Sequence, residues 1–254
     1  MSCSETSAAL REPLAATATT ASRWLLVELP GAWERDVADH DLPPFDGRRM
    51  LLRRPGRRGP EGAVFVGETT EEGGRLVQIP SLDRLESGDA EPVDHPLVLV
   101  CCHGRRDVCC ARRGKPVFDA LRDLPGVWQS SHQGGHRFAA NVLVLPAGIQ
   151  LGRVQPGEAP AVVASLLEGR IPLDHYRGRT LYPAHVQAAE VAVRQAHGLD
   201  RVADVRLLSD DGHSVELAVP GGSVTCVVEV GAGPFLPQSC GAAPEETPSF
   251  RVTF

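Results

Sequence analysis

The chain has 254 residues, a hydrophobic content of 42%, a charged content of 23% and a formal net charge of −6. This composition is typical of a globular protein that buries its core in one large domain or two small ones. The acidic balance disfavours a nucleic-acid partner, and no apolar run reaches the length of a membrane span. Residues 1–20 lack the apolar core of a secretory signal, so we expect a cytoplasmic protein without a membrane partner.

Short apolar runs bounded by proline and glycine predict strands in the first third of the chain. These runs cover residues 24–29, 50–52, 63–66 and 76–79. Residues 87–96 are acidic and contain two prolines, which predicts a linker into the next unit. We therefore expect an N-terminal segment, residues 1–91, that is rich in strands. The sequence does not decide whether these strands share a sheet with the middle third.

The middle third, residues 92–174, predicts the order β-α-β-β-β-α, which is close to the thioredoxin arrangement. Its first strand is a continuous apolar run, as expected of a strand that is buried on both faces. A helix should open near Gly114, because Pro116 suits the first turn of a helix. The predicted strands are 97–100, 127–130, 141–145 and 149–154, and the second helix is 159–169.

The last third, residues 175–254, predicts a helix followed by an antiparallel sheet. The helix should cover 183–197. Strands are expected near 205–208, 215–219, 225–230 and 251–254, with Gly-Gly and Asp-Gly turns between some of them. The predicted fold class is therefore α/β (α+β), with a thioredoxin-like domain between the strand-rich N-terminal segment and the C-terminal helix and sheet.

Four of the seven cysteines lie within residues 101–110, and two histidines, His132 and His136, follow about twenty residues later. Neighbouring cysteines are seldom bridged to each other, because such a disulfide distorts the peptide between them. Clustered thiols in a chain of this kind indicate metal ligands or redox groups rather than structural disulfides. Two thiolates and two imidazoles that meet at one point form a four-ligand metal site.

The cysteines occur as two adjacent pairs, and each pair is expected to supply one ligand. Successive side chains of a strand point to opposite faces, so Cys101 and Cys102 cannot both face one site. The same argument applies less strictly to Cys109 and Cys110, which we expect in a loop. The glycine pair at 134–135 between the histidines disfavours a helix and predicts a folded-back loop.

Two motifs together resemble the sucrase/ferredoxin-like family. They are Val-Cys-x-His-Gly-x-Arg-Asp-x-x-Cys and Ser-His-x-Gly-Gly-His-x-Phe-Ala-x-Asn, in this order. The resemblance covers residues 97–154, with weaker matches at 24–33 and 176–190. This family includes thioredoxin-like ferredoxins that hold a 2Fe–2S cluster with two histidines, so the resemblance implies an electron-transport protein with an iron–sulfur cluster.

Carried over residue by residue, the family's ligands fall on Cys101, Cys110, His132 and His136. Cys102 and Cys109 are the alternative thiolates, because this chain has a second cysteine beside each position. The resemblance also implies a protein partner for electron exchange, such as a ferredoxin or flavin reductase. An electron carrier needs no substrate pocket, so the sequence leaves open whether the protein is an enzyme.

Other functions fit the same residues less well. Zinc accepts two cysteines and two histidines, but eight residues between the cysteines exceed the usual zinc-binding spacing. A redox or iron sensor would use the same site as an electron carrier. Thiol–disulfide exchange normally needs Cys-x-x-Cys at the start of a helix, and the chain has no such pair. Hydrolysis of a glycosidic bond needs two carboxylates placed across the bond, and no acidic residues in the sequence stand out for that role.

Several further residues have weaker assignments. Asp107 is a candidate to accept a hydrogen bond from a ligating histidine, or to pair with Arg106 on the surface. His103 is expected to be a loop or packing residue. Arginine pairs at 48–49, 53–54 and 57–58 suggest either a solvated surface or a docking site for an acidic partner. The remaining cysteines should pack as small hydrophobic side chains: Cys3, Cys226 and Cys240.

Overall fold

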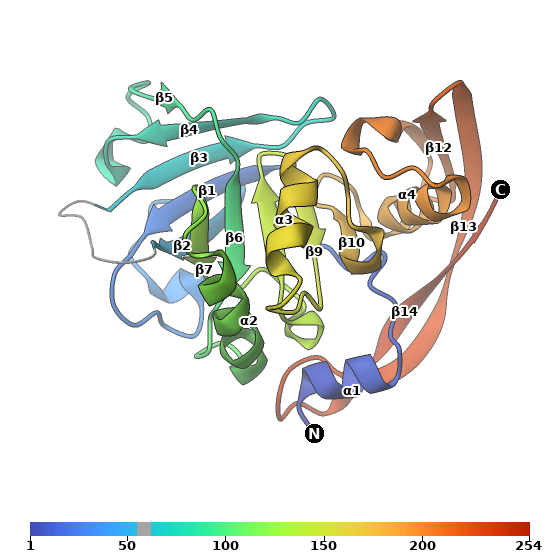
Figure 1. The fold of residues 1–254 in the computed structure, drawn as a ribbon, viewed down its shortest axis with the longest axis horizontal. Coiled ribbons are helices and arrows are strands. Elements are labelled where there is room, and N and C mark those ends of the chain that lie inside the picture. The colour runs from blue at the N-terminus through green and yellow to red at the C-terminus, as the bar shows by residue number, and fades with distance from the viewer. Residues whose placement is uncertain (55–61) are drawn as a thin grey trace.

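The computed structural model describes residues 1–54 and 62–254 of the chain. In these residues ten strands form one mixed sheet, in the order β10-β9-β8-β6-β7-β2-β1-β3-β4-β5 (Figure 1). Its strands are β1 (Arg23–Glu28), β2 (Arg48–Arg53), β3 (Val64–Glu68), β4 (Arg75–Ile79), β5 (Glu91–Pro92), β6 (Leu97–Cys101), β7 (Val127–Ser130), β8 (Val142–Leu145), β9 (Ile149–Leu151) and β10 (Tyr176–Arg179).

The strands predicted in the first third are confirmed, and they belong to the same sheet as those of the middle third. The two sets join where β2 pairs with β7 in an antiparallel register, with Leu52 opposite Ser130. The segment 87–96, predicted to be a linker, contributes β5 to the edge of the sheet instead, where Val77 lies opposite Pro92. The division into segments 1–91, 92–174 and 175–254 stays a prediction.

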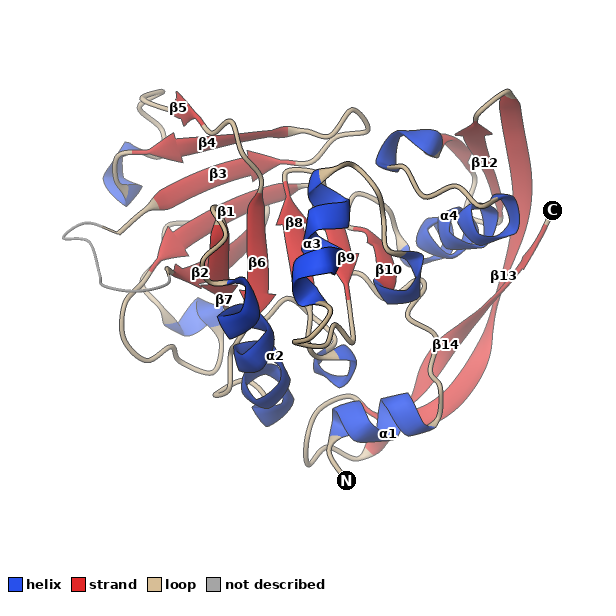
Figure 2. Ribbon diagram, viewed as in Figure 1, coloured by secondary structure: helices blue, strands red, loops and turns tan. Residues whose placement is uncertain are grey.

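The α/β fold class is confirmed, and the middle third has the predicted order of elements. Strand β6 runs parallel to β7 and antiparallel to β8, which forms a hairpin with β9. Helices α2 (Val108–Leu121) and α3 (Ala159–Leu167) lie in front of these strands in Figure 2. Both helices bury apolar side chains against β6, β8 and β9. This packing fixes the first turn of α2 beside the end of β6.

The predicted start of α2 at Gly114 is wrong, because the helix begins at Val108. Asp107 precedes it in an extended conformation, and its Oδ1 accepts a hydrogen bond from the backbone N–H of Cys109 at 2.8 Å. A side chain that satisfies a free N–H in this way defines the start of a helix. Cys109 and Cys110 therefore lie in the first helical turn rather than in a loop, and Pro116 lies inside the helix.

Strand β6 is buried on both faces, as its continuous apolar sequence predicts. Val98 and Val100 pack in the cluster that contains α2 and α3, whereas Leu97 and Leu99 pack in the cluster that contains β1 and β2. Burial of one such side chain stabilises the fold by about 2 kcal/mol. Cys101 is the last residue of this strand and is 1% exposed, so the core extends to the edge of the predicted metal site.

The last third forms the predicted helix and antiparallel sheet. The elements are α4 (Ala184–His197), β11 (Arg206–Asp210), β12 (Ser214–Val219), β13 (Gly222–Pro237) and β14 (Pro244–Thr253). Strands β13 and β14 are longer than predicted. Their far end lies beside α1 (Cys3–Ala9), a short helix at the N-terminus that the sequence analysis did not predict (Figure 1). None of the helices in the described residues has the length and hydrophobicity of a membrane-spanning segment.

Candidate metal centre

The structure brings three of the four predicted ligands into one group at the end of β6, and the fourth, His136, adjoins this group. One sulfur or nitrogen atom from each of Cys101, Cys110 and His132 lies within 4.8 Å of the others. The ring of His136 stacks on the ring of His132, with centroids 4.2 Å apart. The Nδ1 atom of His136 lies 3.9 Å from Sγ of Cys110. Two thiols and two imidazoles thus converge on one small volume.

The two alternative cysteines lie elsewhere. Cys102 packs against the apolar cluster of α2 and α3, on the opposite side of the strand end from Cys101. Cys109 packs with Cys3 and Cys240, away from the two histidines. The alternation of side chains along a strand explains the separation of Cys101 from Cys102.

The loop that carries the histidines depends on glycine. Strand β7 ends at Ser130, and the 3₁₀ turn that begins at His136 follows Gly135. Gly135 has φ +67°, in the left-handed region that side chains disfavour. A Cβ atom at Gly135 would lie 2.5 Å from Nη2 of Arg177 and 2.8 Å from the ring of Phe138. The predicted folded-back loop is confirmed, and glycine permits both its conformation and its close packing.

Two arginines, one buried and one partly buried, hold this loop through its carbonyl groups. Arg177 is 1% exposed and donates to the carbonyl oxygen of Gly134 at 3.1 Å and to Oδ1 of Asn141 at 2.8 Å. Arg48 donates to the carbonyl oxygen of His132 at 3.0 Å. Asn141 in turn donates to the carbonyl oxygen of Gly135 at 3.0 Å. The backbone around both histidines is therefore held by hydrogen bonds to charged or amide side chains, which are stronger than average when the donor is charged.

His103 also positions the loop. Its Nδ1 accepts a hydrogen bond from the backbone N–H of His132 at 3.3 Å, and its Nε2 donates to the carbonyl oxygen of Glu34 at 2.7 Å. The side chain is 2% exposed, and burial lowers its pKa. It is therefore the neutral tautomer with the proton on Nε2. The prediction of a loop or packing role for His103 is confirmed.

Burial and hydrogen bonding set the charge state of the predicted ligands. A hydrogen bond from the Cys110 thiol to the Cys101 sulfur lowers the pKa of Cys101 and raises that of Cys110. Burial lowers the pKa of His136 to about 4, so its ring is neutral at pH 7 and keeps a lone pair for a metal. Positively charged Arg48 and Arg177 stabilise the Cys101 thiolate from nearby. Without a metal, this hydrogen bond favours the thiolate on Cys101 and the thiol on Cys110.

One buried atom indicates that the donor set is incomplete without a ligand. Nδ1 of His132 is buried and has no hydrogen-bond partner among the described residues. An unsatisfied buried polar atom costs about 1–3 kcal/mol, so a bound partner such as a metal ion would stabilise the site. Part of the His132 side chain reaches solvent, whereas Cys110 is fully buried. The residues present therefore fit an iron–sulfur cluster or a metal ion that is exposed at its histidine side.

The prediction for Asp107 is wrong in both its forms. Its carboxylate accepts hydrogen bonds from the backbone N–H groups of Cys109 at 2.8 Å and Cys240 at 2.7 Å, rather than from a ligating histidine. Arg106 pairs with Asp36 and not with Asp107.

The arginine pairs at 48–49, 53–54 and 57–58 were expected to form a solvated surface or a docking site. Arg48 instead holds the histidine loop, so it is not part of a free docking surface. Residues 57–58 lie outside the described residues.

Sequence reasoning missed the roles of Arg48 and Arg177. Both occur in short arginine-containing runs, which are usually solvated, and nothing in those runs marks the arginines as buried. The glycine beside Arg177 was the available signal, because Gly178 lies inside a strand, where a Cβ atom would meet Gln187. Such a close approach indicates that this strand is packed on both sides.

A cavity of about 450 Å³ lies beside the histidine loop. Gly135, Arg177 and Phe138 line one side of it, and residues of α4 and β14 line the other. Arg137, from the turn that begins at His136, also lines it. A volume of this size lies within the range of ligand sites.

The sucrase/ferredoxin-like family model matches residues 14–178, which is more than half of the chain. The chain belongs to the sucrase/ferredoxin-like family. The matched residues of this sucrase/ferredoxin-like protein include the four residues that converge at the end of β6, and the match ends before α4 and the four-stranded sheet. The resemblance noted in the sequence is therefore confirmed.

Similar proteins include altered inheritance of mitochondria protein 32 from two yeasts. The protein from Clavispora lusitaniae is 32% identical over 101 residues, which is 35% of this chain and 37% of that protein. The protein from Meyerozyma guilliermondii is 32% identical over 103 residues, which is 35% of this chain and 36% of that protein. The sucrase/ferredoxin-like chain thus spans little more than a third of the curated relatives it matches.

Among solved structures, the thioredoxin-like 2Fe–2S ferredoxin from Aquifex aeolicus is similar to part of the sucrase/ferredoxin-like chain. It has a TM-score of 0.27 and 21% sequence identity, and the match covers 32% of this chain and 88% of the ferredoxin. A variant of the same ferredoxin matches with a TM-score of 0.29 and 20% identity, over 33% of this chain and 99% of that one.

Proposed function

We propose that the protein carries a 2Fe–2S cluster on Cys101, Cys110, His132 and His136 and transfers single electrons. The observation that carries this proposal is the convergence of two buried thiols and two stacked imidazoles, one of which has an unpartnered buried nitrogen. Soft thiolates and neutral imidazoles are the donors that iron–sulfur clusters take in proteins. The cluster would supply a one-electron redox couple.

The surrounding residues favour a cluster of relatively high potential. An oxidised 2Fe–2S core carries a formal charge of about +2, which two thiolates and two neutral imidazoles bring close to zero. Adding an electron to a neutral centre costs less than adding it to a dianion. Arg48 and Arg177 lie close enough to stabilise the Cys101 thiolate, so they stabilise the reduced state further.

The exposure of the ligands suggests where electrons enter and leave. Cys101 and Cys110 are buried, whereas His132 is partly exposed. We expect a redox partner, such as a ferredoxin or flavin reductase, to dock over the histidine side of the site. The seven free cysteines are typical of a reducing compartment, so we propose that the protein works in the cytoplasm.

Electron paramagnetic resonance of the anaerobically purified, dithionite-reduced protein tests this function. Wild type should contain iron and acid-labile sulfide and show average g values near those of Rieske centres. His132→Cys and His136→Cys should move the g values toward those of all-cysteine clusters, whereas His197→Cys adds a thiol on the exposed end of α4 and should leave them unchanged. A protein without iron and labile sulfide would overturn the proposal, and zinc that is lost from a Cys110→Ser variant would assign the site to zinc.

A further inference from the structure

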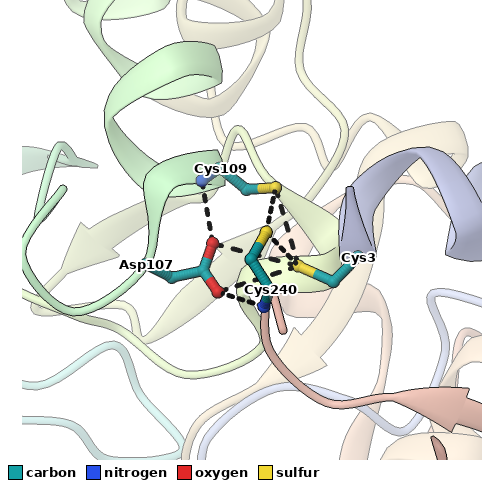
Figure 3. A group of neighbouring side chains, drawn as sticks. All are labelled: Cys3, Asp107, Cys109 and Cys240. Carbon is teal, nitrogen blue, oxygen red and sulfur yellow. Dashed lines mark hydrogen bonds between the residues drawn. The ribbon is translucent and has the colours of Figure 1, made fainter. Parts of the chain in front are cut away.

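A second group of metal-binding side chains lies apart from the four predicted ligands. Cys3, Cys109, Cys240 and Asp107 each place one sulfur or oxygen atom within 4.8 Å of the others (Figure 3). The sulfur atom of Cys109 is 3.3 Å from that of Cys240 and 3.6 Å from that of Cys3. The sulfur atoms of Cys3 and Cys240 are also 3.6 Å apart. Three thiols therefore form a compact triangle.

Three distant parts of the chain supply this triangle. Cys3 is in the first turn of α1, Cys109 is in the first turn of α2, and Cys240 lies in the turn between β13 and β14. Cys3 and Cys109 are each 2% exposed, and Cys240 is half-buried. The start of α2 also favours negative charge, because its free N–H groups carry the positive end of the helix dipole.

The distances between the sulfur atoms match those around a single tetrahedral metal ion. Sulfur atoms in a disulfide are about 2.05 Å apart, which is far shorter than any distance in this group. Zinc with four tetrahedral ligands at a Zn–S distance of about 2.3 Å separates its sulfur atoms by about 3.8 Å. In a cubane iron–sulfur cluster each cysteine binds a different iron, so the sulfur atoms would lie much farther apart. The observed triangle fits one ion of zinc size.

Asp107 gives the group a fourth donor. Its two oxygen atoms lie 3.9 Å from the sulfur of Cys3 and accept hydrogen bonds from the backbone of Cys109 and Cys240. The residue is 5% exposed, and among the described residues it forms no salt bridge. The two backbone N–H groups and the start of α2 favour the charged carboxylate, which is the form that binds a metal ion. A carboxylate oxygen also favours zinc over Cu(I), which prefers sulfur donors.

We propose that Cys3, Cys109, Cys240 and Asp107 bind one zinc ion, which joins α1 and the β13–β14 turn to the first turn of α2. This zinc ion is separate from the proposed iron–sulfur cluster, and either proposal can fail without the other. Its role would be structural, because a fourth donor leaves no open position for a substrate. Zinc would also close two long loops, since Cys109 is 106 positions from Cys3 and 131 positions from Cys240.

Metal analysis of the full chain tests this site. Protein purified anaerobically without chelators should contain about one zinc ion per chain in addition to its iron. Cys3→Ser and Cys240→Ser should lose the zinc and keep the iron and labile sulfide, which also shows that they are folded. Cys226→Ser is the matched control, because Cys226 is a buried free cysteine outside both groups. Zinc should stay in this variant.

Alkylation of the wild-type protein gives a second test that needs no variant. Bound zinc should protect Cys3 and Cys240 from iodoacetamide, and removal of zinc by a chelator should expose both, as mapped by peptide mass spectrometry. The proposal is overturned if wild type holds iron but no zinc, or if alkylation at these two residues is the same with and without chelator. Loss of zinc from Cys110→Ser but not from Cys240→Ser would also overturn it, because the zinc would then occupy the other site.

Discussion

Cys109 and Cys110 are neighbours in the first turn of α2, yet their sulfur atoms belong to two different groups of donors. Successive residues of a helix are rotated by about 100° around its axis. One sulfur therefore faces Cys101 and His132, and the other faces Cys3 and Cys240. The start of a single helix thus contributes a ligand to each of the two proposed metal sites.

This relationship predicts opposite effects of the same substitution at adjacent positions. Cys110→Ser should lose most of the bound iron, because it removes one of two buried thiolates from the cluster. Cys109→Ser should keep the iron and lose the proposed zinc. Iron and zinc per chain, measured on both variants prepared side by side, check the prediction. Equal loss of iron from both variants would contradict the assignment of Cys110 as the ligand.

The two proposed histidine ligands predict a reduction potential that depends on pH. Imidazole bound to ferric iron loses its second proton more readily than imidazole bound to ferrous iron, so reduction is accompanied by proton uptake at high pH. The midpoint potential should fall as pH rises, by about 59 mV per pH unit where one proton accompanies one electron. Potentiometric titration across alkaline pH checks this. A flat profile would count against histidine ligation.

The conformation and close packing of Gly135 predict that adding one methyl group at this position destabilises the protein. Gly135→Ala should destabilise the protein by about 2 kcal/mol, because the residue has φ +67° and the new Cβ would press on Arg177. Arg177 cannot move away without breaking its hydrogen bonds to the loop. Gly157→Ala is the control, since a Cβ there meets nothing within 4 Å, and its effect should stay below about 0.5 kcal/mol. Chemical denaturation measures both.

The low pKa of His136 predicts acid sensitivity of the metal-free protein. Its ordinary pKa is 6.5, and burial lowers it to about 4 in the folded state. Between these values the unfolded chain binds more protons than the folded one, so stability should fall as pH drops from 6.5 to about 4. The loss at this site is at most about 3 kcal/mol.

The check is chemical denaturation of chelator-treated protein at several pH values in this window. His136→Gln should remove this part of the pH dependence, because the amide does not titrate. His197→Gln changes an exposed histidine on α4 and should leave the profile as in wild type. Identical profiles for wild type and His136→Gln would show that His136 is not the group that titrates.

The sequence predicted those parts of the fold whose signal is local. The apolar run of β6 and the helix predicted over residues 183–197 both correspond to elements in the structure. The start of α2 was misplaced, because Gly114 and Pro116 resemble the opening of a helix and proline inside a helix is rare. Asp107 was the better signal, since an aspartate before a helix commonly caps its free N–H groups.

The ligands of the candidate site could be predicted from the sequence because they lie in two short motifs. Cys101, Cys110 and the two histidines lie within 36 residues, so their grouping follows from neighbouring elements. The partnership of Cys3 with Cys240 joins residues 237 positions apart, and no local pattern encodes such a contact. The burial of Arg177 is likewise a property of the packed sheet rather than of its sequence neighbours.

Arg137 connects the site to both ends of the chain. It directly follows His136, and it donates to Glu12 at 2.8 Å and to Gln238 at 2.6 Å. The family match covers residues 14–178, so both of these acceptors lie outside the matched part of the chain. A fragment trimmed to the matched residues would leave Arg137 without either acceptor. Measurements that test the proposed cluster therefore need the residues on both sides of the matched part as well.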